Sequence, residues 1–201
     1  MIPGPVTPLV LHGRTVVPGV AEGEALVSYE TISGWGGIDP ARGIVIERRH
    51  PLYGVSFAGK VLVFPGAKGS SGWAGFFQAT RLSGTAPLAL VFVTTTSKAA
   101  LGAVVTRVPT VTGLDRDPLT VIRTGDRVRV DADHGTVTVY PAAPGTAPAL
   151  EPTRESAAPE VPAPPVPVPT SAAPTVPAAP VPTASVPVPP ARDSATTRRR
   201  P

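Results

Sequence analysis

Cysteine is absent from the 201-residue sequence. The chain therefore has no thiolate to ligate an iron–sulfur cluster, no disulfide and no thiol nucleophile. Long apolar runs are also missing, since no stretch approaches the ~18 apolar residues that a membrane-spanning helix needs. The N-terminus lacks the basic region and apolar core of a signal peptide. We therefore expect a soluble, cytoplasmic protein that does not enter a membrane.

Aromatic side chains make up only 5% of the sequence, and none of them lies in residues 142–201. That stretch holds 17 of the 28 prolines and is otherwise mainly Ala, Val, Thr and Ser. Proline interrupts helices and sheets, and too few bulky side chains remain to offset the chain entropy lost on folding. We expect an irregular segment at 1–12, one folded domain at 13–141, and a disordered tail at 142–201 with polyproline II character.

The net charge of +4 is small, and basic residues are scattered over the predicted domain without a basic patch among aromatic residues. This distribution argues against nucleic-acid binding. Arg198–Arg200 are interpreted as the solvated end of the tail.

The stretch Lys60–Thr80 organises the rest of the sequence. Val61–Phe64 is an apolar run typical of a buried strand, and a Pro-Gly pair ends it. A loop of small residues follows, and then apolar side chains recur at helical spacing, so we expect a helix that starts near Ser71.

Elsewhere the apolar patterns and turn signals predict a mixture of strands and helices. We therefore expect a mixed α/β fold, with a mixed sheet or small barrel and helices on one side. The predicted strands are 14–17, 22–28, 44–46, 88–93, 109–111 and a hairpin of 127–133 with 136–140. The predicted helices are 97–105, capped by Ser97, and a turn at 118–123.

The loop residues Lys68, Gly69, Ser70, Ser71 and Gly72 form a candidate anion-binding site. Free N–H groups and the macrodipole at a helix N-terminus attract carboxylate or phosphate. The glycines let a ligand approach the backbone, the lysine adds charge, and either serine can face the ligand or cap the helix. On the local pattern alone, a helix cap is the simpler interpretation. The loop is not a Walker A motif, because its lysine precedes the final glycine.

Three further features have both a functional and a structural interpretation. His50 precedes a proline in a turn, where a histidine usually bonds locally, and the Gly-rich loop Trp35–Asp39 can border a cleft or form tight turns. Asp131 and Asp133 resemble a pair of carboxylate ligands. Their spacing between two alternating strands instead predicts a hairpin turn, and we assign them no metal.

Seven short motifs occur in a characteristic order from Gly13 to Tyr140. Each is weak alone, but together they resemble the swivel domain of the aconitase X family. The motifs are Gly13-Arg-Thr-Val-Val-Pro-Gly, Trp35-Gly-Gly-Ile-Asp-Pro, His50-Pro-Leu-Tyr-Gly, Ala58-Gly-Lys-Val-Leu-Val, Lys68-Gly-Ser-Ser, Gly84-Thr-Ala-Pro and Arg123-Thr-Gly-Asp-Arg-Val-Arg-Val-Asp.

The resemblance implies a swivelling β/β/α domain, like the mobile domain of aconitases, which can be a separate small subunit. It would form a heterodimer with a large subunit that carries an iron–sulfur cluster, leaving no cofactor or metal on this chain. The reaction would be dehydration of a small hydroxy acid. The family's serine base corresponds to Ser70, with Ser71 as the second choice and Lys68 beside it.

The resemblance also has departures and open alternatives. Trp73-Ala74 stands where relatives have a Gly-Ser pair, so Trp73 is expected either to reshape the pocket or to mark a changed substrate, and Gly34 replaces a bulkier residue. Two substrates are compatible, 5-phosphomevalonate, which we favour, and cis-3-hydroxy-L-proline. The alternative is a non-catalytic interaction protein whose Pro-x-x-Pro tail binds a partner, although a spacer is the simpler role for the tail.

Overall fold

The computed structural model describes residues 7–69 and 72–142. These residues lie in the first of two compact units of the chain, Met1–Ala157, whereas the second unit, Ala158–Pro201, lies outside the described residues. Almost all of the predicted tail, including Arg198–Arg200, therefore lies outside them as well.

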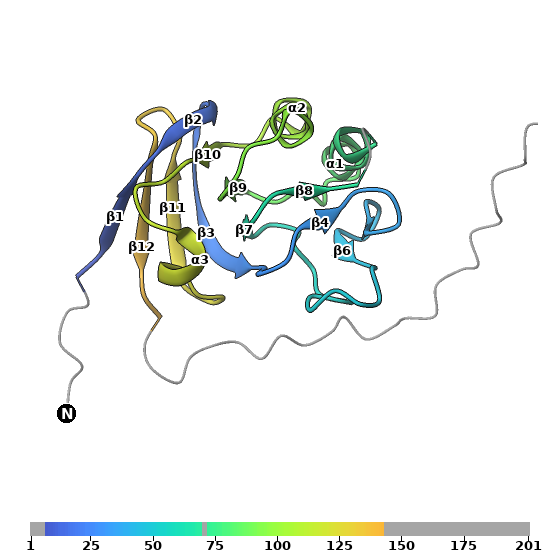
Figure 1. The fold of residues 1–201 in the computed structure, drawn as a ribbon, viewed down its shortest axis with the longest axis horizontal. Helices are drawn as coiled ribbons and strands as arrows, with labels where there is room; N and C mark the ends of the chain where they lie inside the picture. The colour runs from blue at the N-terminus through green and yellow to red at the C-terminus, as the bar shows by residue number, and fades with distance from the viewer. Residues whose placement is uncertain (1–6, 70–71, 143–201) are drawn as a thin grey trace, which may run out of the picture. The chain divides into compact units, whose positions relative to one another are not determined.

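The described residues form short strands and three helices, and the helices lie between β8 and β11 in the chain (Figure 1). The strands are β1 (Leu9–His12), β2 (Arg14–Val17), β3 (Val20–Val27), β4 (Ile32–Ser33), β5 (Ile38–Asp39), β6 (Ile44–Val45), β7 (Val61–Phe64), β8 (Ala67–Lys68), β9 (Ala89–Phe92), β10 (Thr110–Thr112), β11 (Arg127–Asp131) and β12 (Thr136–Tyr140). The helices are α1 (Trp73–Leu82), α2 (Ser97–Thr106) and α3 (Pro118–Val121).

The main sheet has the strand order β1-β12-β11-β3-β7-β9-β10-β2. Its centre is parallel, because β3, β7, β9 and β10 run in the same direction, and antiparallel strands flank this centre on both sides. Helices α1 and α2 pack against each other on one side of the parallel strands, as Figure 1 shows. The prediction of a mixed α/β fold is confirmed, with α1 and α2 on one side of the sheet; the short α3 contacts β7 from the other face.

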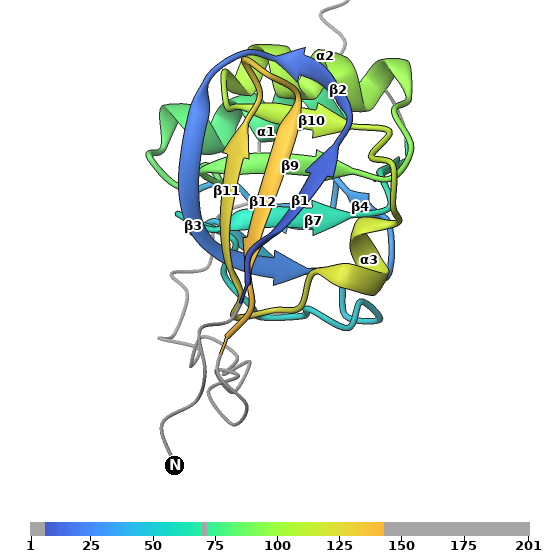
Figure 2. The ribbon, with the colours of Figure 1, turned by 90° about the vertical axis from the view of Figure 1, so that its left-hand side faces the viewer.

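The two edge strands of this sheet are consecutive in the chain, since β1 ends at His12 and β2 begins at Arg14. The sheet must therefore curl until its edges meet at Gly13, and Figure 2 shows this curvature. The Gly13 N–H donates to the carbonyl of Gly135 at 2.8 Å. A Cβ at Gly13 would lie 2.7 Å from the carbonyl oxygen of Thr112, so the junction has room only for glycine.

Two hydrophobic cores lie on opposite faces of the central strands. Successive side chains of a strand point to opposite faces, so in β7 Val61 and Val63 join the core inside the curled sheet. Leu62 and Phe64 join the core under the helices. Strand β9 repeats this order of smaller side chains inside and larger ones toward the helices.

Trp73 anchors the start of α1 in the core beneath the helices. Its side chain is 1% exposed, stacks on Phe77 with 3.9 Å between ring centroids, and donates its indole N–H to the Ile32 carbonyl at 3.0 Å. Two glycines make this position possible. A Cβ at Gly102 of α2 would lie 2.1 Å from the indole ring, and a Cβ at Gly34 would lie 2.6 Å from the Trp73 Cα. Trp73 therefore acts on the neighbouring loop through packing in the core.

Several expectations need correction. The segment 1–12 is not irregular throughout, because residues 9–12 form β1, which pairs with β12. Ser97 is not the cap of α2; Thr96 is the N-cap, and its hydroxyl accepts the Ala99 N–H at 3.3 Å. The short strands β4, β5 and β8 were not predicted. The hairpin of β11 and β12 is confirmed. Of the helices in residues 7–69 and 72–142, none has the length and apolarity to cross a membrane.

The space that Gly102 leaves for the indole of Trp73, here called the Gly102 notch, predicts that two helical glycines differ in their tolerance of alanine. We expect Gly102→Ala to lower the free energy of unfolding by about 1–3 kcal/mol, the usual cost of overpacking, because its Cβ overlaps the indole. Gly75→Ala in α1 is the matched control. Its Cβ would meet nothing within 4 Å, and alanine favours a helix over glycine by roughly 0.5–1 kcal/mol. Urea unfolding of the full chain measures both, and equal stabilities of the two variants would contradict the packing account.

Candidate functional site

The candidate site lies where β7 and β9 end, at the same edge of the sheet. The two strands are parallel with Phe64 opposite Phe92, so the segments that follow them begin side by side. The Thr94 N–H donates to the Pro65 carbonyl at 3.0 Å and links these segments directly. The carboxyl ends of parallel strands are the usual ligand-binding edge of open α/β sheets.

The predicted loop after β7 is partly a strand. Ala67–Lys68 forms β8, which pairs in parallel with β4. Gly69 follows with φ +89°, a conformation that favours glycine. Helix α1 then begins at Trp73, close to the predicted start, with Gly72 at its N-cap and no side-chain cap bond. Ser70 and Ser71, the predicted catalytic residue and its alternative, lie outside the described residues.

Lys68, the lysine of the predicted anion-binding loop, forms an ion pair with Glu47. Its ammonium lies 2.6 Å from Oε1 of Glu47, and the lysine side chain is 38% exposed. The second carboxylate oxygen, Oε2 of Glu47, is buried and has no hydrogen-bond donor among the described residues. The charge of Lys68 is therefore balanced by a carboxylate that sequence reasoning missed.

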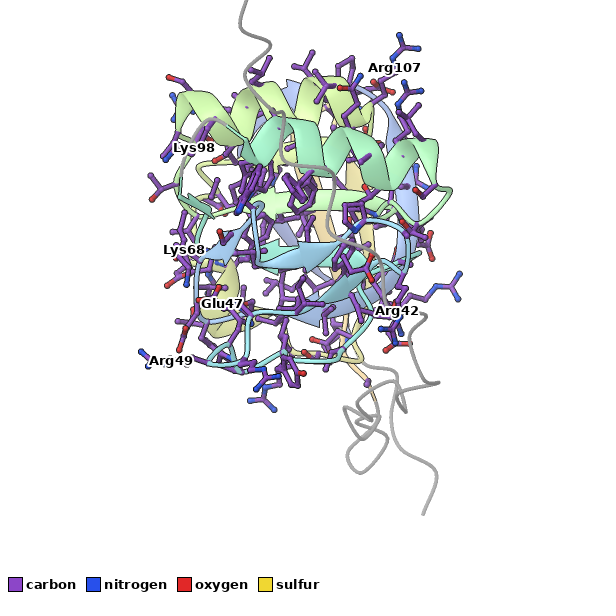
Figure 3. All side chains as sticks on the ribbon, turned by 90° about the vertical axis from the view of Figure 1, so that its right-hand side faces the viewer. Arg42, Glu47, Arg49, Lys68, Lys98 and Arg107 are labelled. Atoms are coloured by element: carbon purple, nitrogen blue, oxygen red, sulfur yellow. The ribbon has the colours of Figure 1, made fainter. Side chains whose placement is uncertain are left out.

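Lys98 reaches the same loop from α2. Its ammonium donates to the carbonyl of Gly69. Thr96, Ser97, Lys98 and Leu101 line a surface depression of about 480 Å³ beside this contact. Figure 3 shows the face of the domain that carries α1 and α2. Lys98, Lys68, Glu47 and Arg49 follow one another along one edge of this face, and Arg42 and Arg107 lie at the opposite edge. Lys98 was not predicted as a site residue. The available signal was its position in the first turn of a predicted helix, two residues after the N-cap Thr96.

His50 bonds locally, as its structural interpretation predicts. The residue is 3% exposed, its Nδ1 accepts the Leu52 N–H at 3.1 Å, and its Nε2 lies 3.3 Å from the Ser28 hydroxyl. An Nδ1 that accepts a hydrogen bond carries no proton, so the imidazole is neutral in this arrangement. Burial lowers the pKa of His50, and the backbone of Glu30 and the charge of Glu47 oppose this effect.

The Trp35–Asp39 loop combines a turn with an exposed aromatic side chain. Trp35 is 75% exposed, and its ring meets Phe76 of α1 edge-on with centroids 5.7 Å apart. Asp39 closes a turn, because its Oδ1 accepts the Ala41 N–H at 2.9 Å.

Asp131 and Asp133 have structural roles at the β11–β12 turn. Oδ1 of Asp133 accepts the Gly19 N–H at 2.7 Å, and Oδ1 of Asp131 lies 2.9 Å from Nδ1 of His134. The hydrogen bond from His134 lowers the pKa of Asp131. Asp131 thus closes the turn internally, and Asp133 ties it to Gly19.

Comparison with known proteins identifies the family. The aconitase X swivel domain matches residues 10–139. The chain belongs to this family. The fold and family expected from the seven sequence motifs are therefore confirmed.

The chain is similar to small subunits of phosphomevalonate dehydratase and to two solved structures. The phosphomevalonate dehydratase small subunit of Methanosarcina acetivorans is 40% identical over 65% of this chain and 90% of its own length. That of Thermococcus gammatolerans is 41% identical over 64% of this chain and 96% of its own length. The crystal structure of Thermococcus kodakaraensis aconitase X in its holo form matches with a TM-score of 0.63 and 39% identity, covering 66% of this chain and 99% of that chain. A UPF0107 protein solved by solution NMR matches with a TM-score of 0.61 and 41% identity, covering 66% of this chain and 100% of that chain.

The side chains of this aconitase X swivel domain do not fit an iron–sulfur cluster. Such clusters are held mainly by cysteine thiolates, and the sequence contains no cysteine. Residues 7–69 and 72–142 also contain no group of three His, Cys, Asp or Glu side chains that could hold a metal ion. We therefore derive no step on this chain through a cluster of its own.

The buried neutral His50 predicts a pH dependence of stability. Because its folded pKa lies below the usual value of 6.5, the unfolded chain binds more protons in this range, and stability falls as the pH drops below about 6.5. We expect His50→Gln to reduce this slope. The free energies of unfolding of the wild type and the variant, measured at about pH 8, 7, 6 and 5, test this change of slope. The exposed His12→Gln variant is the control that should keep the slope, and identical slopes for all three proteins would contradict the assignment.

Proposed function

We propose that this chain is the small subunit of an aconitase X-type hydro-lyase that dehydrates 5-phosphomevalonate in a heterodimer with a large subunit. The observation that carries the proposal is its 40% identity with a subunit of that name over 90% of that subunit's length. The candidate loop at the carboxyl edge of the sheet supports a binding role for the same residues that the motifs single out.

The large subunit would contribute the iron–sulfur cluster, since this chain offers no thiolates. As a Lewis acid, the cluster would assist departure of the substrate hydroxyl. The part left to this chain is to bind the acid at the sheet edge and to remove the proton next to its carboxylate.

In this proposal Ser70 is the base, with Lys68, Gly69, Ser71 and Gly72 around the substrate. A serine hydroxyl is a weak base unless its alkoxide is stabilised. Backbone N–H groups at the start of α1 and the ammonium of Lys68 are suited to that task, because positive partial charges and hydrogen bonds favour an anionic oxygen. Gly69 permits the backbone turn just before the serine.

The proposed catalytic role predicts a selective loss in Ser70→Ala. We expect the heterodimer to form normally while turnover of 5-phosphomevalonate falls by about 10²–10⁴-fold, the usual contribution of a positioned acid or base. The assay uses the complex purified with a cluster-loaded large subunit. Ser83→Ala, after the far end of α1, is the matched control and should retain full turnover.

The outcomes separate the alternatives. Unchanged turnover in Ser70→Ala refutes the serine base. A wild-type complex that dehydrates cis-3-hydroxy-L-proline but not 5-phosphomevalonate corrects the substrate. A cluster-loaded complex that converts neither compound favours the non-catalytic interaction protein. The cytoplasmic location stays a prediction.

We also propose that the domain ends near residue 142. The Ala142 N–H donates to Oδ1 of Asp126 at 2.9 Å, and Asp126 is 5% exposed, which fixes the chain at the end of β12. Removal of residues 143–201 keeps this contact. We expect the melting temperature of the truncated chain to stay within about 2 °C of the full chain, whereas a shift of more than about 4 °C, near 1 kcal/mol for a domain of this size, would contradict the boundary.

A further inference from the structure

Among the described residues, two lysines reach the candidate loop, and one of them brings a charge that no carboxylate balances. Lys68 is paired with Glu47 at 2.6 Å, so the pair adds no net charge to the site. Lys98 has no carboxylate within ion-pair distance among the described residues, and the group that its ammonium contacts is the neutral carbonyl of Gly69. The uncompensated positive charge beside the loop therefore belongs to Lys98.

The position of Lys98 is fixed by its helix. Thr96 caps α2, and the hydroxyl of Thr95 donates to that of Thr112 at 2.5 Å, which ties the helix start to the end of β10. Trp73 packs into the Gly102 notch of the same helix. The stem of Lys98 thus leaves a well-anchored turn close to Gly69.

The ammonium of Lys98 has capacity for a ligand. It carries three N–H donors, and within residues 7–69 and 72–142 the carbonyl of Gly69 takes one of them. The depression of about 480 Å³ lined by Thr96, Ser97, Lys98 and Leu101 leaves space beside it. The contact has a second effect, because the ammonium offsets the negative end of a carbonyl that would otherwise repel an anion at this edge.

We propose that Lys98 binds an anionic group of the substrate, carboxylate or phosphate, and sets the affinity of the site for anions. The inference rests on the proposed function and adds a substrate-binding residue to it. Lys68, in contrast, contributes a hydrogen-bond donor whose charge Glu47 has already neutralised. Lys98 would couple α2 to the ligand and to the backbone of the loop at once.

The test compares Lys98→Met, Lys98→Arg and Lys60→Met in the purified two-subunit complex. Lys60 is the control. Like Lys98 it is half-buried, but it is paired with Glu24 at 2.8 Å and precedes β7, so it lies at the end of β7 opposite to the candidate loop. The measurements are the KM and kcat for 5-phosphomevalonate and the inhibition constant of inorganic phosphate.

Loss of a charge-assisted hydrogen bond should raise the KM and the phosphate inhibition constant of Lys98→Met by about 10- to 100-fold, with a smaller change in kcat. Lys98→Arg should recover most of the affinity, and Lys60→Met should match the wild type. The inference is overturned if the phosphate inhibition constant is unchanged in Lys98→Met, or if kcat alone falls and arginine does not restore it. The second result would leave Lys98 only as a support of the loop.

Failure of the proposed function would give a different experimental result from failure of the Lys98 inference. If the wild-type complex dehydrates another hydroxy acid, the substrate assignment is wrong, but Lys98→Met must still weaken binding of that acid's carboxylate and of inorganic phosphate. Direct titration of the complex with inorganic phosphate gives this readout without turnover. Equal phosphate affinity of wild type and Lys98→Met in that titration overturns the inference whatever the substrate is.

Discussion

The packing of Trp73 between two glycines is the constraint on which the candidate site depends. The indole fills the space left by Gly102 in α2, while Gly34 lets the β4 segment lie against the backbone of Trp73. The bond from the indole to Ile32 fixes β4, and β4 in turn pairs with β8 just before Gly69. One buried ring therefore sets the relative positions of both helices and of the strand that leads into the loop.

This arrangement gives a physical meaning to two unusual positions in the sequence. Gly34 and Trp73 looked like separate departures from the family pattern, yet they meet in the structure with Gly102 as the third member. A bulky side chain at Gly34 would collide with the Trp73 Cα. The backbone at position 73 therefore requires the glycine at 34, and the indole of Trp73 requires the glycine at 102.

Much of the fold could be predicted from local pattern. The alternation of β11 and β12 is a strong periodic signal, and the continuous apolar runs of β7 and β9 indicate fully buried strands; the burial of these strands confirms both predictions. Strand β1 was missed because the prolines just before it suggested an irregular segment. Its pairing partner β12 lies over 100 residues away in the sequence, so no local pattern indicates the pairing. The Glu47–Lys68 pair and the reach of Lys98 to Gly69 also join distant segments, and no local pattern encodes such contacts. The loop between β7 and α1, in contrast, was predicted from its motif, and the role of its two serines stays a prediction.

The junction at Gly13 has a consequence for how the molecule can associate. Exposed sheet edges are templates for pairing with another chain. Here the two edge strands of the sheet are joined through a single residue, so the two edges converge at Gly13 and leave little space for a further strand at that end. The backbone of Asp115 adds a bond to the His12 carbonyl at 2.7 Å and covers part of the β1 edge. Association through side-chain surfaces, rather than growth of a continuous ladder between molecules, is the mode that this geometry favours.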